Sequence, residues 1–289
     1  MRAVRPDLIV VGDVMVDVSV DSGALARGGD VHGEVRLRPG GVGANAAVWA
    51  AEAGAKVRLH GRVGDDLFGR AVCEALAARE VEPALAFDPE APTGAMLVVR
   101  ESGERSMVAD RGANARLSPE DLPPALEASA VLVSGYLLFD PRSEAAARVG
   151  LERARAGVVA VEAASWPLLE AFGVERFFEA TAPATLLLAN ELEAETLSGA
   201  KGDAAASALA ERYPTVCVKL GERGAIMARD GRLFRAKAPS VVEADPTGAG
   251  DGFDGALLAA LSLGVSWEDA LTRACAAGAR AAASPELWP

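Results

Sequence analysis

The sequence predicts an α/β protein with a doubly wound, mostly parallel sheet and a small β lid. Short apolar runs, typical of buried parallel strands, alternate with Ala-rich segments of helical character. Two segments interrupt this order and predict strands outside the main sheet: one alternates polar and apolar residues, and the other has two β-type runs around a turn. With 289 residues, 51% of them hydrophobic, the chain has enough apolar surface for one large α/β domain or two smaller ones.

The strands of the main sheet are expected where an apolar, β-type run is bounded by polar residues. These runs are 7–11, 56–59, 130–133, 157–161, 185–188 and 215–219. The helices are expected in Ala-rich stretches between the strands, because alanine has the highest helix propensity. These stretches are 45–53, 69–78, 142–156 and 204–211. Strands that alternate with helices favour a sheet covered on both faces.

The lid is expected at 18–38 and 93–111. The first segment contains VHGEVRLR, and the second contains two β-type runs around a Glu-Ser-Gly-Glu turn. We expect antiparallel strands inserted into an α/β body formed by 1–17, 39–92 and 112–289. Surface hairpins without a function are the alternative. Exposed lid strands need covering, and a homodimer through these strands would cover them.

The last third of the chain predicts a hairpin and two helices. Residues 223–237 form two β-type runs around Asp230-Gly231, a dipeptide typical of a tight hairpin turn. Ala-rich helices are expected to follow at 257–263 and 267–283.

Composition excludes several classes of function. The formal net charge of -12 and the absence of a basic run argue against a nucleic-acid surface, because clustered Lys and Arg hold phosphate backbones. No apolar run reaches the ~20 residues that cross a bilayer, so a cytoplasmic protein is expected. Three distant cysteines and two histidines indicate neither a disulfide framework nor a His-rich metal site.

The stretch ADPTGAGDGFDGALLAAL, residues 244–261, predicts an anion site at the start of a helix. Glycines there allow close approach to free backbone N–H groups. Asp251 would conflict with a bound anion unless it has a task, and phosphoryl transfer needs both groups: backbone donors for the phosphoryl and a carboxylate for the proton of an attacking hydroxyl. The alternative is a capped helix with an ordinary first-turn acid.

A second glycine cluster, RPGGVGANAAVWAAEAGA, occupies 38–55. It contains Gly41-x-Gly43, but about thirty residues separate it from the first strand, whereas a dinucleotide-binding turn follows its strand directly. We therefore reject NAD. The Asn45 amide could bind a polyhydroxylated ligand or cap a helix.

Asp13 and Asp17 straddle the end of the first strand. The carboxyl ends of parallel strands border the crevice where such sheets bind ligands, and these carboxylates could accept hydrogen bonds from sugar hydroxyls. The alternative is that Asp13 or Asp17 is a solvated turn residue.

Over essentially its whole length the sequence resembles the PfkB carbohydrate kinases, the ribokinase-like family. The resemblance rests on four motifs in the right order. The first motif is GGVGANAAVWAAEAGA together with the GRVGDDLFG that follows it. The other three are NELEAE from Asn190, VKLGERGA from Val218, and DPTGAGDGFDGALLAAL.

This resemblance implies an ATP-dependent, magnesium-requiring kinase that phosphorylates a hydroxymethyl group of a small sugar or sugar derivative under a closing lid. Asp251 would be the base, and Gly248, Ala249 and Gly250 the anion hole. Sugar binding would fall to Asp17, Gly41 and Asn45. The nucleotide would lie against Asn190, Lys219, Gly221 and Gly224, with Glu193 at magnesium through water.

Other points remain open. Met15 stands where the ribokinase branch often has Asn, and Glu162 where many relatives have Asp. Arg111 resembles an arginine that some relatives use for acidic sugars, and a surface ion pair with Asp110 or Glu104 is its alternative. A nucleoside or vitamin-precursor kinase and a non-catalytic ligand sensor are the rival functions. A monovalent cation near Asp245 is also left open.

Overall fold

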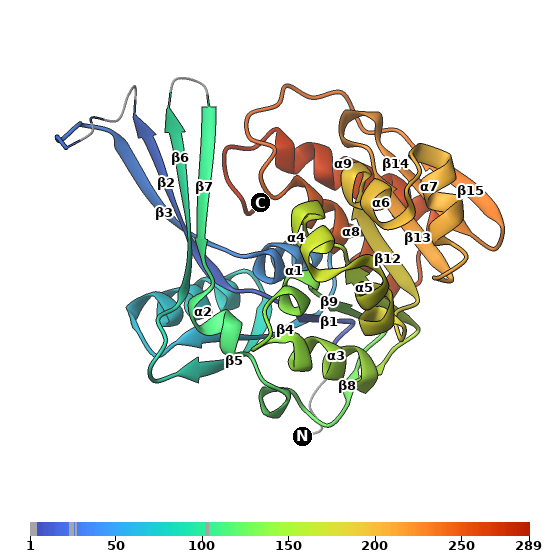
Figure 1. Cartoon of the computed structure of the whole chain (residues 1–289), viewed down its shortest axis with the longest axis horizontal. Helices are drawn as coiled ribbons and strands as arrows, with labels where there is room; N and C mark the ends of the chain where they lie inside the picture. Colours follow the sequence, from blue (N-terminus) through green and yellow to red (C-terminus); the bar gives the residue numbers. More distant parts are fainter. Residues whose placement is uncertain (1–4, 23–25, 27, 102–103) are drawn as a thin grey trace.

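The large sheet forms the centre of the molecule. The structure is a computed structural model that describes residues 5–22, 26, 28–101 and 104–289. The strands of this sheet are β1 (Leu8–Val11), β4 (Val57–Gly64), β5 (Val81–Asp88), β9 (Ala130–Val133), β11 (Val158–Glu162), β12 (Leu186–Asn190), β13 (Thr215–Lys219), β14 (Ala225–Arg229) and β15 (Arg232–Ala236). Their order is β15-β14-β13-β12-β11-β9-β1-β4-β5 (Figure 1), and all neighbouring pairs are parallel except β13–β14 and β14–β15. The predicted doubly wound, mostly parallel sheet is confirmed.

Helices cover both faces of the sheet. Leu8 and Val10 of β1 belong to one hydrophobic core, while Ile9 and Val11 belong to a second, as the two-residue period of a strand requires. The helices with buried side chains in the first core are α1 (Val42–Glu52), α2 (Leu67–Ala78), α8 (Ala249–Ser262) and α9 (Trp267–Ala282). Those with buried side chains in the second are α3 (Glu144–Arg153), α4 (Trp166–Phe172), α5 (Val174–Thr181), α6 (Glu191–Ser198) and α7 (Gly202–Leu209).

The lid is a separate four-stranded sheet that projects from the body (Figure 1). Its strands are β2 (Met15–Ser22), β3 (Glu34–Gly40), β6 (Gly94–Glu101) and β7 (Glu104–Asp110), in the order β3-β2-β6-β7. The β2–β3 and β6–β7 pairs are antiparallel as expected, but β2 and β6 are parallel, because both strands leave the body in the same direction. Positions 23–25, 27, 102 and 103 of the predicted lid lie outside the described residues.

Several boundaries differ from those predicted because tertiary pairing decides them. The strand expected at 56–59 continues to Gly64, since β5 pairs with β4 along its whole length. The helix expected at 142–156 ends at Arg153, because the next two residues form β10 (Ala154–Arg155), which pairs with β8 (Leu126–Glu127). The predicted hairpin is confirmed: β14 and β15 flank Asp230 and Gly231, both at positive φ.

Helices α1 and α8 pack with their backbones in close contact. A Cβ at Gly255 would lie 3.0 Å from Ala50 N, and one at Gly252 would lie 3.3 Å from the Trp49 ring. Helix α8 begins at Ala249 rather than at Leu257 as expected. This packing brings the N-terminus of α8 beside α1. Within the described part of the chain, no helix combines the length and apolarity that spanning a membrane would need.

Candidate active site

The N-terminus of α8 begins at a glycine in the left-handed conformation. Gly248 has φ 77°, which other residues adopt only at a cost. The Gly252 N–H donates to Gly248 O at 2.8 Å, so helical bonding starts there, and the preceding N–H groups have no partner within the helix. One of these, the Ala249 N–H, donates to Pro246 O at 3.2 Å. The helix end presents backbone donors and the positive end of the helix dipole to an anion.

Asp251 lies in the first turn of α8, opposite Asn45 of α1. Asn45 Nδ2 donates to Asp251 Oδ2 at 2.7 Å. Burial raises the pKa of Asp251 to about 7, while the Asn45 hydrogen bond and the charge of Lys219 lower it. A carboxyl group with a pKa near neutrality can take a proton from a substrate and release it again. The structure therefore brings the predicted base and a predicted sugar-binding residue into contact.

Asp17 lies on β2 of the lid sheet, near enough to Asp251 for the two charges to interact. Burial raises the pKa of Asp17 to about 6, and Arg38 lowers it. The charge of Asp17 in turn raises the pKa of Asp251. Gly41 connects β3 to α1 at φ 94°, and a Cβ there would lie 2.9 Å from Met15 N. This close approach holds the start of α1 against the start of β2.

A reciprocal capping box joins Asn190 and Glu193 at the start of α6. Asn190 donates to the Glu193 carboxylate from Nδ2 at 2.6 Å and from its backbone N–H at 2.7 Å. The Glu193 N–H donates to Asn190 Oδ1 at 2.9 Å. Burial raises the pKa of Glu193. Asn190 is also the register partner of Lys219 at the carboxyl ends of β12 and β13, so the predicted nucleotide residues share one edge of the sheet.

A buried ion pair lies beside the start of α8. Lys219 Nζ is 2.7 Å from Asp254 Oδ2. Burial lowers the pKa of Lys219, but the charges of Asp254, Glu193 and Glu162 outweigh this effect, and the net shift is upward. A Cβ at Gly250 would lie 3.5 Å from Lys219 Nζ. The ammonium group is therefore close to the backbone donors of α8, where it could stabilise negative charge.

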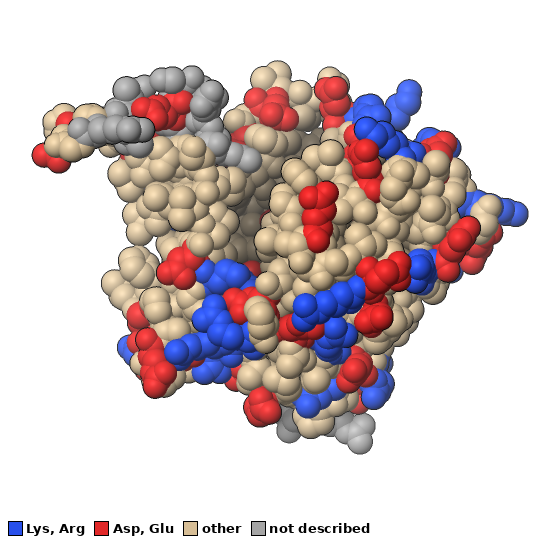
Figure 2. Space-filling model, viewed as in Figure 1, with Lys and Arg blue, Asp and Glu red and all other residues tan. Residues whose placement is uncertain are grey.

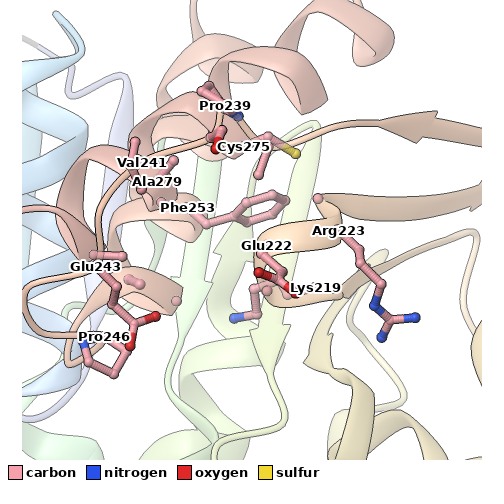
Figure 3. A pocket seen from close by; sticks show the side chains of 18 residues that line it. Lys219, Glu222, Arg223, Pro239, Val241, Glu243, Pro246, Phe253, Cys275 and Ala279 are labelled. Atoms are coloured by element: carbon pink, nitrogen blue, oxygen red, sulfur yellow. The ribbon is translucent and has the colours of Figure 1, made fainter.

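A cavity of about 460 Å³ opens next to these groups (Figure 3). The predicted residues that line it are Lys219, Gly221, Gly224, Ala249 and Gly250. Phe253 and Cys275 add an apolar wall, and the Arg223 side chain points away (Figure 3). The volume falls within the range of small-molecule sites, and an apolar wall next to backbone donors suits a ligand with a flat base and a charged end.

Arg111 is held inside the molecule by two carboxylates. Its Nη2 donates to Asp13 Oδ1 at 2.8 Å, and its Nη1 is 3.7 Å from Asp140 Oδ2. These ion pairs replace the surface pair with Asp110 that the sequence left as an alternative, because the guanidinium turns toward the end of β1. The Glu104 side chain lies outside the described residues. The positive charge of Arg111 is already balanced.

A family model described as pfkB family carbohydrate kinase matches residues 5–287, nearly the whole chain. The chain belongs to this family. The lid, the α8 helix start and the cavity described above are therefore features of a pfkB family carbohydrate kinase.

Curated and solved pfkB relatives resemble the chain over most of its length. It is 31% identical to a ribokinase of Mus musculus over 264 residues, which cover 86% of this chain and 80% of that protein. It is 31% identical to a 2-dehydro-3-deoxygluconokinase of Thermoproteus tenax, with 82% and 77% covered. The crystal structure of a putative Ribokinase II in complex with ATP and magnesium from E. coli has a TM-score of 0.83 and 25% identity, with 96% and 92% covered.

Three residues of the site, Asp254, Ser134 and Trp288, were not predicted from the sequence. Asp254 lies three residues after Asp251, and this helical spacing was a signal for a second carboxylate on the same face. Ser134 Oγ donates to Glu162 Oε1 at 2.8 Å, and burial raises the pKa of Glu162 to about 8. Trp288 donates to Asn45, and no local pattern points to this contact.

The molecule is hollowed between the lid and the right-hand part of the body (Figure 2).

Proposed function

We propose that this pfkB kinase transfers the γ-phosphoryl group of ATP to a hydroxyl, of the hydroxymethyl kind, on a small sugar or sugar derivative. One observation carries the proposal: Asp251, a half-buried carboxyl group whose pKa is raised to about 7, lies at the N-terminus of α8, next to Gly250 in the wall of the cavity. A base and an anion hole at one point are what phosphoryl transfer to an alcohol requires.

In the proposed reaction the substrate oxygen attacks the γ-phosphorus in line with the leaving group. The new O–P bond forms as the bond to the β-phosphate oxygen breaks, and Asp251 takes the proton of the hydroxyl. The N–H groups at Gly248 and Gly250 and the Lys219 ammonium stabilise the charge on the moving phosphoryl. The Ala249 N–H, the third donor predicted for the anion hole, already donates to Pro246 O. ADP leaves as the trianion, with the electron pair of the broken bond on its β-phosphate oxygen.

The nucleotide is proposed to lie in the 460 Å³ cavity, with its base against Phe253 and its phosphates toward Lys219 and α8. Among the described residues, no three acidic, His or Cys side chains form a cluster for a metal ion. Glu193 still fits magnesium, which is commonly held by one carboxylate, waters and substrate phosphates. When bound, magnesium would neutralise phosphate charge, and Glu193 and Asn190 would orient its waters.

The acceptor is proposed to lie between Asp17 and Asn45, under the lid. Asp17 interacts with the Asp251 carboxyl group electrostatically, and Asn45 donates a hydrogen bond to it. Closure of the lid would exclude water from the reacting phosphate. Because the charge of Arg111 is balanced by Asp13 and Asp140, this arginine does not by itself favour an acidic sugar.

The test is ADP release by the purified protein with ATP and magnesium. The acceptors are ribose, fructose, 2-keto-3-deoxygluconate, adenosine, pseudouridine and hydroxymethylpyrimidine, with and without potassium to test for a monovalent cation near Asp245. We expect turnover with a sugar at a rate well above that with the nucleosides or the pyrimidine. Preference for a nucleoside would move the assignment to that class. If no acceptor stimulates ADP release although the protein binds ATP, the result would favour a non-catalytic sensor.

We also propose a homodimer through the lid. Leu37, Val18, Leu97 and Val108 are register partners across all four strands, and Leu37 and Val108 are 54% and 64% exposed. By strand alternation this apolar row lies on the face opposite Asp17. Val18 packs against the core of the body, but the other three side chains of the row are exposed. Exposed apolar side chains gathered on one face are typical of an interface rather than of a solvated surface.

Light scattering after gel filtration is expected to give a mass near twice 29.6 kDa. Leu37→Glu should reduce it to the monomer mass, because the new charge would be buried without a partner. Leu263→Glu, at an exposed leucine outside the lid, is the matched control and should leave the dimer intact. A parent protein that elutes as a monomer at micromolar concentration would refute the dimer.

A further inference from the structure

The last residues of the sequence run from the end of α9 back to α1 and to the N-terminus of α8. We call residues 284–289 the tail. The Trp49 indole N–H donates to Leu287 O at 3.0 Å, and Arg79 donates to Pro289 O. Arg38 forms an ion pair with Glu286 at 3.0 Å. A Cβ at Gly248 would lie 3.5 Å from Leu287 Cδ2, so the tail touches the N-terminus of α8.

Trp288 connects the tail to the candidate active site through a hydrogen bond to Asn45. Its side chain is 9% exposed, and its Nε1 donates to Asn45 Oδ1 at 2.9 Å. On the other side of the same amide, Asn45 Nδ2 donates to Asp251 Oδ2 at 2.7 Å. Trp288, Asn45 and Asp251 therefore form one chain of two hydrogen bonds from the tail to the carboxyl group.

The chemistry of the indole decides how the amide is turned. An indole N–H can only donate, so the Asn45 atom that faces it must be the oxygen. The Asn45 nitrogen is then directed at Asp251. Without Trp288 the amide could rotate by half a turn and present its oxygen to the carboxylate, which would be repulsive.

We propose that Trp288 is a positioning residue: through its indole N–H it fixes the Asn45 amide so that Nδ2 donates to Asp251. The inference rests on the proposed function, since Asp251 matters as the base of phosphoryl transfer. Trp288 acts through Asn45. The hydrogen bond from Asn45 stabilises the carboxylate form of Asp251 and fixes which carboxyl oxygen stays free for the substrate.

Other charges also act on Asp251, and the test must hold them constant. Lys219 at the end of β13 lowers its pKa, while Asp254 on α8 and Asp17 on β2 raise it. Two further titratable groups interact with it electrostatically, Glu162 at the end of β11 and Tyr136 in the 3-10 turn at 135–139. A substitution in the tail leaves all five groups in place, so a change in the ionisation of Asp251 reports on the hydrogen-bond chain.

The experiment compares Trp288→Phe with Arg79→Gln. The Phe variant keeps an aromatic ring but loses the N–H. The control removes the Arg79 bond to Pro289 and the guanidinium that lies 6.0 Å from the centroid of the Trp288 ring, but it keeps the indole N–H that donates to Asn45. In the unliganded protein, the ionisation of Asp251 is followed by NMR of the Asn45 side-chain amide. We expect Trp288→Phe to raise the midpoint by about half a unit to one unit, because the bond to the carboxylate is weakened. Arg79→Gln should not move it.

The acid limb of the kcat–pH profile should shift upward by the same amount, with KM for ATP within about twofold, since the nucleotide cavity is untouched. Trp288→His, which keeps a ring N–H, should shift less than Trp288→Phe. If the Phe variant is folded and its amide midpoint equals that of the parent, Trp288 does not position Asp251. If the parent phosphorylates no acceptor, the proposed function fails, and the amide titration still decides whether Trp288 controls Asp251.

Discussion

Asp251→Asn is expected to lower kcat by about 10²–10⁴, the range for removal of a general base. The asparagine has the same shape and can still accept the hydrogen bond from Asn45, so the anion hole and α8 should keep their geometry. What is lost is the ability to take the proton of the attacking hydroxyl. Steady-state ADP release measures the effect, and ATP affinity by calorimetry should stay within about threefold of the parent.

The pH dependence gives this prediction a second readout. Burial raises the pKa of Asp251 to about 7, so the parent kcat should fall as the pH drops through that value and the base becomes protonated. The residual activity of Asp251→Asn should lack this limb. A variant that turns over at nearly the parental rate, or keeps the limb, would show that another group accepts the proton.

The sign of the stability change follows from the same pKa. Because the folded protein holds the Asp251 proton more tightly than the unfolded chain does, ionisation of Asp251 costs stability as the pH rises through about 7. Asp251→Asn removes that cost and should be at least as stable as the parent at pH 8 by thermal unfolding. A large loss of stability would mean that the activity loss cannot be assigned to the base alone.

The sequence predicted the parts of the site whose chemistry is local. Gly248 and Asp251 could be placed at a helix start because turn, glycines and apolar period follow one another within a few residues. The carboxyl ends of the strands could be expected at one edge because alternating strand and helix imply a parallel sheet. The lid strands could be expected from their alternating polarity, but the parallel pairing of β2 and β6 could not, since strand neighbours far apart in sequence are chosen by tertiary contacts.

Contacts between distant segments could not be predicted from pattern. The Asn45–Asp251 hydrogen bond depends on close packing of α1 against α8, which the glycines permit but do not specify. Trp288 reaches Asn45 from a tail without helical or strand period. Lys219 lies in a recognisable segment, yet its ion pair with Asp254 depends on how α8 sits over β13.

Lys219→Met is expected to reduce the free energy of unfolding by about 3–5 kcal/mol, because it leaves a buried carboxylate without its partner. Asp254 is 2% exposed, and its Oδ1 has no hydrogen-bond partner among the described residues. The pKa of Lys219 is raised, so the ammonium is charged and the ion pair intact at neutral pH. Urea unfolding at pH 7.5 measures the loss.

The same substitution should lower kcat by about 10²–10³, the effect of removing one group that stabilises charge in the transition state. The Lys219/Asp254 pair allows stability and activity to be separated. Adding Asp254→Leu to Lys219→Met replaces the pair by apolar side chains, which is often neutral for stability. We expect the double variant to recover most of the lost stability but not the activity, because no positive charge faces the phosphoryl at Gly250.

Each combination of results assigns Lys219 a different role. If the double variant regains both stability and turnover, the lysine serves only to neutralise Asp254. If it regains stability alone, with kcat still reduced and KM for ATP little changed, the ammonium acts on the phosphoryl in the transition state. If KM for ATP rises while kcat holds, the ammonium binds the phosphates equally in the ground state. The proposed mechanism requires the second result.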